Sequence, residues 1–273
     1  MSEGQGGTWI ALPAAKAGVL LRAIYLRDLL RELVVRDMKL RYERSALGVL
    51  WAVVNPLAQL LVFVIVFKHV IRLQIPNYPL FVFIGVLAWN WTREALLRSS
   101  NAITSNRGLI RQPGFPIGLL PVVSLTTPLI DLLIALPVLA FFVAFGGGTF
   151  TLAILSLPLV IALQFLLLQG VGYFVAATQV RFRDTGHLLG VILMLGFYLT
   201  PIFYSAEDVP PGFRALFTFN PMAHIVTAYR SIILHGQIPD PGALVALALL
   251  GAILCWAGQR AFERASHRFA EAL

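Results

Sequence analysis

Charged residues are scarce in this sequence, and their absence is concentrated in long runs. Asp, Glu, Lys and Arg make up 12% of the 273 residues, whereas hydrophobic residues make up 58%. An ordinary soluble domain has roughly 25% charged residues. Six runs contain no charged residue: 45–67, 73–92, 112–130, 132–180, 185–206 and 241–259. Because a helix needs roughly 20 apolar residues to cross a bilayer core of about 30 Å, the pattern excludes a soluble domain and predicts an all-α integral membrane protein.

Cysteine and the common catalytic motifs are also nearly absent. The single cysteine, Cys255, has no partner within the chain, which excludes a disulfide framework and a multi-cysteine metal site. The three lysines do not stand in a GxxxxGK[ST] sequence, so there is no P-loop for ATP, and HExxH, CxxC and GxSxG are missing too. The histidines occur singly. We therefore expect no catalytic residue, no metal site and no cofactor bound by this chain.

The basic residues predict the direction of six membrane-spanning helices, expected at 46–69, 78–97, 117–145, 151–178, 186–205 and 242–259. With the N-terminus in the cytoplasm, 17 of the 21 Lys and Arg residues fall on the cytoplasmic side, as the positive-inside rule requires. We expect both termini there, with a tail over 1–21, a transmembrane domain over 45–260 and a second tail over 261–273. Topology and lipid contact then explain the net charge of +8, so no nucleic acid partner is expected.

Two cytoplasmic segments have the composition of surfaces that meet a partner. Residues 22–44 predict an amphipathic helix along the inner membrane surface. Its apolar stripe consists of Leu26, Leu29, Leu30, Leu33 and Met38. Residues 93–116 are polar with one apolar side and end in prolines, which indicates a short helix pressed against something outside the bilayer. The simpler alternatives are a membrane anchor for the first segment and a plain connecting loop for the second.

The segment 206–240, expected on the outer side, is too apolar for a solvated loop and too often broken by proline for a further span. Irregular backbone at membrane depth is tolerated only where it is buried in protein or lines a cavity. We therefore expect two short re-entrant or interfacial helices in this segment. They form either an outer gate or a stabilising cap.

Asp131 is the only acidic residue well inside a predicted span. A carboxylate at the centre of a span costs about 2.5 to 3.5 kcal/mol, so we expect Asp131 to face the bundle interior or to lie near a helix end. A paired structural role is favoured over proton relay because no second intramembrane carboxylate accompanies it. With so few buried ionisable groups, the chain is interpreted as a conduit that takes its energy from elsewhere.

Short motifs follow one another along nearly the whole chain. In the first half they are Arg36, Asp37, Arg41-Tyr42, Leu47-Gly48, Leu50-Trp51, Asn55-Pro56, Gly85, Trp89, Asn106, Leu109-Ile110, Phe115-Pro116 and Leu120-Pro121. In the second half they are Arg183-Asp184, Tyr198 to Pro201, Tyr204, Pro210, Asn220-Pro221 and Tyr229-Arg230. Their order and spacing resemble the transmembrane permease subunit of ABC-2 type polysaccharide exporters, the family of O-antigen and lipopolysaccharide ABC transporters.

The resemblance implies a homodimer of this chain with two separate ATP-binding cassette subunits, which bind the ATP and Mg²⁺. The implied cargo is O-antigen type polysaccharide linked through pyrophosphate to undecaprenyl, and the implied location is the bacterial inner membrane. In this family the N-terminal surface helix and the helix between the second and third spans dock on the ATPase. The corresponding coupling residues are Arg31, Arg36, Asn101, Ser105, Asn106 and Leu109.

The resemblance also places an outer gate at Pro210, Phe213, Phe217, Asn220, Pro221, Tyr229 and Arg230. Aromatic faces stack on sugar rings while water solvates the hydroxyl groups. We therefore expect a channel lined by Trp51, Phe63, Trp89, Trp91, Phe197, Tyr198 and Tyr204. The planar fork of arginine matches phosphate oxygens, so the lipid pyrophosphate is expected at Arg41, Arg44 and Arg183.

Two alternatives remain open. An ABC-2 exporter of capsule, teichoic acid or a small hydrophobic drug would keep the fold and the ATPase and change the cargo. An intramembrane enzyme acting on polyprenyl-linked sugars would need convergent acids or histidines at one membrane depth, and the sequence offers none. A stand-alone carrier coupled to ions would need more buried ionisable groups. A neighbouring ATPase gene would favour the exporters.

Overall fold

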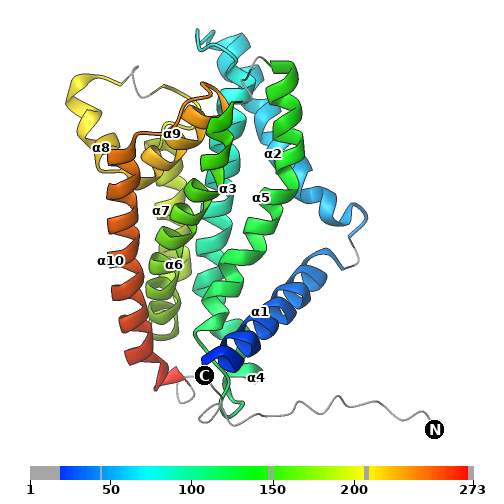
Figure 1. The fold of residues 1–273 in the computed structure, drawn as a ribbon, viewed down its shortest axis with the longest axis vertical. Coiled ribbons are helices and arrows are strands. Elements are labelled where there is room, and N and C mark those ends of the chain that lie inside the picture. The colour runs from blue at the N-terminus through cyan, green and yellow to red at the C-terminus, as the bar shows by residue number, and fades with distance from the viewer. Residues whose placement is uncertain (1–18, 44, 147, 149–150, 206–208, 270–273) are drawn as a thin grey trace.

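The computed structural model describes residues 19–43, 45–146, 148, 151–205 and 209–269, and its regular structure is entirely helical (Figure 1). Within these residues five stretches are long and apolar enough to cross a membrane: Gly48–Val70, Tyr78–Asn101, Leu119–Gly146, Leu152–Arg181 and Pro241–Ser266. They comprise η1 (Gly48–Leu50), α2 (Trp51–Phe63) and η2 (Val64–Val70), then α3 (Tyr78–Asn101), α5 (Leu119–Gly146), η4 (Leu152–Ser156), α6 (Leu157–Arg181) and α10 (Pro241–Ser266). The predicted all-α, multi-pass membrane architecture is confirmed.

The helix α3 lies at the centre of the bundle. Of the residues in its most apolar stretch 78% are buried, whereas only 11% are buried in the most apolar stretch of Gly48–Val70. It packs between α5 and α6, and α10 packs along α6 (Figure 1). The start of α3 is fixed by Asn77, whose φ of 50° lies in the left-handed region. Pro79 stands in the first turn, where a backbone N–H would have no acceptor within the helix, so proline loses no helical hydrogen bond there.

The helix predicted over 186–205 is shorter than expected. Helix α7 runs from Thr185 to Leu199, and its 15 residues rise about 22 Å, less than the roughly 30 Å of a bilayer core. It ends there because Thr200 precedes Pro201, and a proline ring disfavours helical backbone at the preceding residue. Thr200 is accordingly extended, with φ −101° and ψ 135°.

The last helix is longer than the span predicted over 242–259, because α10 continues to Ser266.

One end of the bundle, here termed the α4 end, carries α1 (Val19–Tyr42), η3 (Thr104–Asn106), α4 (Arg107–Ile110) and the last turns of α10 (Figure 1). A buried apolar cluster holds the short helices to α5 and α10. Its large members are Ile103, Ile110, Leu120, Tyr173, Phe262 and Phe269. The first helix and the end of the last helix therefore lie toward the same end of the molecule.

Helix α1 uses most of its predicted apolar stripe to pack on the protein. Leu33 and Val34 are buried against Val123 of α5, and Leu29, Leu30 and Met38 join the same cluster. Other apolar side chains of α1 stay exposed: Val19, Leu20, Leu21, Ile24, Val35 and Leu40. Apolar side chains are thus spread around α1, some docked on α5 and others uncovered, where the sequence pattern indicated a single stripe.

The opposite end, here termed the α9 end, carries the two short helices expected within 206–240 (Figure 1). They are α8 (Arg214–Thr218), which follows η6 (Pro211–Phe213), and α9 (Pro221–Ile233). Helix α9 contacts α3 and α6 and buries Ile225, Val226 and Ile232, whereas α8 has no buried residue. The two helices therefore differ in role: α9 is part of the core and α8 lies on its surface.

Candidate functional site

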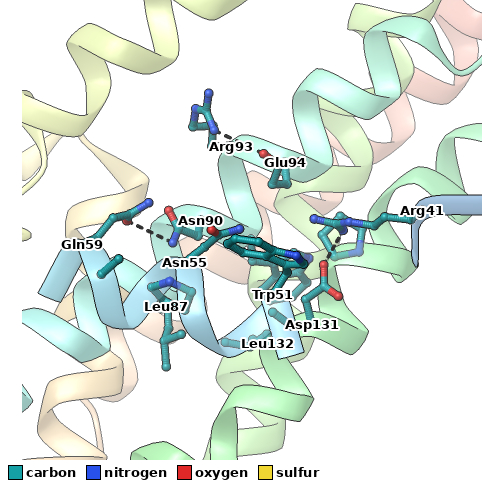
Figure 2. Close-up of a pocket in the computed structure, with 15 residues that line it drawn as sticks. Arg41, Trp51, Asn55, Gln59, Leu87, Asn90, Arg93, Glu94, Asp131 and Leu132 are labelled. Atoms are coloured by element: carbon teal, nitrogen blue, oxygen red, sulfur yellow. Dashed lines mark hydrogen bonds and ion pairs between the residues drawn. The ribbon is translucent and has the colours of Figure 1, made fainter. Parts of the chain in front are cut away.

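A polar cleft of about 340 Å³ opens between α2, α3 and α5, beside the last turn of α1 (Figure 2). Asn55 and Gln59 of α2 and Asn90 of α3 line it, and Asn90 Nδ2 donates a hydrogen bond to Gln59 Oε1 at 3.2 Å. Trp51, also in the lining, is 41% exposed. Because residues four apart lie on one side of a helix, Trp51, Asn55 and Gln59 form a single stripe that faces the cleft.

An ion pair between Arg41 of α1 and Asp131 of α5 forms one side of this cleft (Figure 2). The Tyr42 hydroxyl donates a hydrogen bond to Asp131 Oδ1 at 2.7 Å. Burial, reinforced by that hydrogen bond, raises the pKa of Tyr42 to about 12. The expectation that Asp131 is paired is confirmed, and the pair ties the end of α1 to α5.

Five of the seven aromatic residues predicted for a channel meet in one cluster between α2, α3 and the end of α7. They are Phe63, Trp89, Phe197, Tyr198 and Tyr204. Phe203, which the sequence did not single out, joins them, with its ring centroid 5.6 Å from that of Phe63 and 5.0 Å from that of Tyr204. The structure therefore brings aromatic residues that are distant in sequence into one cluster, in which Trp89 is buried.

The other two aromatic residues lie elsewhere. Trp51 lines the polar cleft. Trp91 borders the same cleft but is only 2% exposed, and its indole N–H donates to the main-chain oxygen of Leu125 at 3.2 Å. Trp91 thus anchors α3 to α5. A role for these seven residues in a channel stays a prediction.

Arg230 of α9 is buried among main-chain carbonyl groups. It is 6% exposed and donates hydrogen bonds to the oxygens of Phe81 at 3.2 Å, Pro201 at 2.6 Å and Ile202 at 2.7 Å. Gly85 provides the space, because an added Cβ there would lie 3.2 Å from Arg230 Nη2. Arg230 therefore binds α9 to α3 and to the segment that ends α7.

The neighbouring Tyr229 belongs to a buried hydrogen-bond network. Its hydroxyl donates to Gln164 Oε1 at 2.9 Å, and Gln164 Nε2 donates to the Ala88 oxygen and to Thr92 Oγ1, both at 2.9 Å. The network joins α9, α6 and α3. In this conformation Tyr229 and Arg230 hold α9 in the core, and their function in a gate stays a prediction.

Asn220 connects the start of α9 to the end of α7. Its Oδ1 accepts a hydrogen bond from the Met222 N–H at 2.9 Å, which caps α9, and its Nδ2 donates to Thr200 Oγ1 at 3.0 Å. Pro221 stands in the first turn of α9, a position that proline favours. The cap and the proline together fix where α9 begins.

The other residues predicted for an outer gate lie around α8. The ring of Phe217 meets that of Tyr204 edge-on at a centroid distance of 5.9 Å. Pro210 and Phe213 are exposed. The predicted gate set is thus divided between the core, the aromatic cluster and the surface.

A wide groove of about 1250 Å³ separates α1 from the α4 segment at the α4 end. Among the predicted coupling residues, Arg31, Arg36 and Leu109 line it. Asn101 and Ser105 are exposed nearby at the end of α3 and in η3 and do not line it. The structure therefore places three of the six coupling residues on one surface, formed by two segments distant in sequence.

Two polar contacts set the position of α1 beside this groove. Arg36 Nη2 donates to Asn106 Oδ1 at 2.8 Å, and Arg98 Nη1 pairs with Asp37 Oδ2 at 2.8 Å. Together with the pair of Arg41 and Asp131, they fasten the second half of α1 to η3, α3 and α5. We interpret α1 as a strut across the α4 end.

The arginines predicted for the lipid pyrophosphate are not assembled in one place. Arg41 lines the cleft, where it is paired with Asp131. Arg183 is exposed in the turn between α6 and α7 and is not part of the cleft lining. Arg44 lies outside the described residues. A phosphate site built from these residues stays a prediction.

Several residues of these sites were not selected from the sequence, among them Gln59, Asn90, Gln164 and Phe203. The three carboxamides lie within charge-free runs, and a polar side chain at membrane depth needs a partner, so their positions carried a usable signal. Phe203 carried none, since it is one of 19 phenylalanines.

Comparison with known proteins gives consistent similarities. Residues 28–234 match the ABC-2 type transporter family. The chain is 34% identical over 257 residues to the O-antigen export system permease protein RfbA of Myxococcus xanthus, covering 93% of this chain and 99% of that protein. It is 32% identical over 250 residues to RfbA of Klebsiella pneumoniae, covering 91% and 96%. Identity to the polysialic acid transport protein KpsM of Escherichia coli is 25% over 230 residues, covering 83% and 89%.

Proposed function

Because this chain belongs to the ABC-2 type transporter family, we propose that it is the channel-forming permease subunit of an exporter that moves undecaprenyl-pyrophosphate-linked polysaccharide of O-antigen type. Support comes from similarity over nearly the whole length to proteins named as O-antigen export permeases, at 34% and 32% identity, against 25% for a polysialic acid transport protein. Two copies of this chain work with two ATP-binding cassette subunits, which bind and hydrolyse ATP with Mg²⁺ in the cytoplasm beneath the bacterial inner membrane.

The proposed topology has six crossings with the α4 end in the cytoplasm. The short helix α7 and the irregular residues 200–205 together make one crossing. Helices α8 and α9 enter from the outer face, and α9 reaches into the bundle, where Tyr229 and Arg230 are buried. The positive-inside rule supports this direction, since Arg107 and Arg111 stand at α4 and Arg260 and Arg264 on the last turns of α10.

The groove between α1 and the α4 segment is the proposed docking site for the ATP-binding subunit. Its rim offers charges of both signs from α1, together with the partly buried Leu109. A displacement of α1 passes to α3 through the pair of Asp37 and Arg98. It passes to α5 through Tyr42 and Asp131, so the polar cleft and the groove are linked by one helix.

The aromatic cluster around Phe203 is the proposed lining along which sugar rings slide. In the same proposal Arg41, Arg44 and Arg183 contact the lipid diphosphate at the inner mouth. Arg41 would then exchange Asp131 for phosphate, and the released carboxylate would keep the hydrogen bond from Tyr42.

The test is the ATPase rate of the chain reconstituted in lipid with its candidate ATP-binding subunit. We expect hydrolysis that requires both chains and changes when purified lipid-linked glycan is added. The proposal would be contradicted if the chain formed no complex with an ATP-binding subunit, or if the ATPase rate of the complex did not change when the glycan was added. Adding capsule polymer or teichoic acid in place of the glycan tests the alternative cargoes directly.

A further inference from the structure

We propose that the polar cleft between α2, α3 and α5 is a saccharide subsite, which holds the sugar residues next to the lipid diphosphate of the transported glycan. The inference rests on the proposed function and adds to it a recognition site for neutral sugar. Its parts are the Trp51 ring, the three carboxamides of Asn55, Gln59 and Asn90, and the neighbouring ion pair.

Carboxamides within an apolar span are energetically unfavourable unless their polar groups find partners. Asn55 and Gln59 are the only Asn or Gln residues in the apolar stretch Gly48–Val70, and both are exposed. Exposed polar side chains within a span are unfavourable against lipid and are expected to face water, protein or a polar ligand. The cleft gives them that environment and holds them on the same face as Trp51.

The carboxamides of the cleft have unused hydrogen-bonding capacity. Within the described residues Asn55 makes no side-chain hydrogen bond, and Gln59 only accepts one, from Asn90. The Gln59 amide donors and the Asn90 carbonyl oxygen are therefore open toward the cleft. A carboxamide offers a donor and an acceptor side by side, which is the arrangement that adjacent sugar hydroxyl groups require, and the exposed Trp51 ring offers a flat apolar face for the opposite side of a sugar ring.

The charges of the cleft lining also bear on which ligand it suits. The ionisable side chains of the lining are Arg41 and Arg93 against Glu94 and Asp131, so their formal charges cancel. Each arginine is paired with one of the acids. With these pairs in place the lining is balanced, which suits a neutral, hydroxyl-rich ligand inside the cleft, and only Arg41, on one side of it, is proposed to turn to the neighbouring diphosphate. A volume of about 340 Å³ lies at the small end of the roughly 300–1,000 Å³ typical of ligand sites.

The experiment compares two probes on the full complex in lipid. One is the lipid-linked glycan purified from cells that make this chain, and the other is undecaprenyl pyrophosphate, which lacks the sugar. For Gln59→Leu and for Asn90→Leu we expect the glycan concentration that gives half-maximal change in ATPase rate to rise about tenfold, as for loss of a hydrogen bond. The same concentration for undecaprenyl pyrophosphate should stay within about twofold, since the diphosphate makes no contact with these amides. Gln59→Asn, which keeps the carboxamide, should lie between Gln59→Leu and the parent.

Leu61→Met is the matched control, because Leu61 is exposed on α2 and does not line the cleft. It should behave as the parent with both probes. The subsite is overturned if the parent responds to the glycan and the leucine variants respond identically, or if the leucine variants shift both probes equally. If the parent complex responds to neither probe, the proposed function fails first, and the subsite with it.

Discussion

The guanidinium carbon of Arg230 lies 3.4 Å from the centroid of the Phe81 ring, while the same guanidinium donates a hydrogen bond to the Phe81 main-chain oxygen. None of the ion pairs in the described part of the chain includes Arg230. The buried cation is therefore held by carbonyl dipoles and an aromatic face rather than by a carboxylate. This contact joins α9 to α3 at the point where α7 gives way to Pro201.

Arg230→Lys should destabilise the protein even though it keeps the positive charge. A lysine has one nitrogen on a flexible stem and cannot reach the carbonyl groups of Phe81, Pro201 and Ile202 together. Since hydrogen bonds from charged groups contribute about 1.5 to 3 kcal/mol each, we expect a clear fall in the thermal midpoint in detergent. Arg214→Lys is the control, as Arg214 is exposed at the same end. Equal midpoints for the two variants would contradict a structural role for Arg230.

Tyr229→Phe should cost about 1 to 3 kcal/mol, because it leaves the buried Gln164 Oε1 without its donor. Gln164→Leu removes the other half of the contact. If the two side chains act as a pair, the double variant should cost less than the sum of the single variants by about 0.5 to 3 kcal/mol. Unfolding titrations in mixed detergent measure all four proteins. Additive costs would show that the two residues act independently.

Asp37→Asn should loosen α1. Arg98 would lose the pair at 2.8 Å and keep only the ion pair of its Nε with Glu94 at 3.9 Å, and this buried Nε has no hydrogen-bond partner among the described residues. A loss of about 1 to 2 kcal/mol corresponds to roughly a 5- to 30-fold increase in opening of the helix. Limited trypsin digestion with mass spectrometry measures cleavage in α1. Asp28→Asn is the control, since Asp28 pairs only with its exposed neighbour Arg27. Equal cleavage of α1 in the two variants would show that the pair of Asp37 and Arg98 does not hold α1 against the bundle.

The spans were predictable from the sequence because one constraint governs them. A charge-free run of sufficient length has few alternatives to a membrane helix, and five predicted spans appear as long apolar helices. The position where α7 ends also depends on a local feature of the sequence. Pro201 disfavours helical backbone at the residue before it and so shortens α7. Hydropathy alone cannot register such a break within an apolar run.

The contacts that build the sites were not predictable in this way. Asp131 needs a partner on energetic grounds, and the sequence supports that expectation, but Arg41 lies 90 residues away and no local pattern selects it. Tyr229 and Gln164 are 65 residues apart, and Arg230 and Phe81 are 149 apart. Such pairs depend on how the helices pack. The charge pattern describes each helix singly and carries no information about that packing.

Gly258→Ala should weaken the packing of α10 on α6. A Cβ at Gly258 would overlap the main-chain oxygen of Gly170, and a Cβ at Gly170 would lie 2.5 Å from the backbone of Leu254, so backbone would have to move in either variant. Overpacking of this kind costs about 1 to 3 kcal/mol, which a thermal midpoint in detergent resolves. Gly190→Ala of α7 is the matched control, because a Cβ there meets nothing within 4 Å and the change relieves the poor helix propensity of glycine by up to about 1 kcal/mol. We therefore expect the two substitutions to shift the midpoint in opposite directions. A Gly258→Ala protein as stable as the parent would mean that α6 and α10 do not approach each other this closely in the membrane.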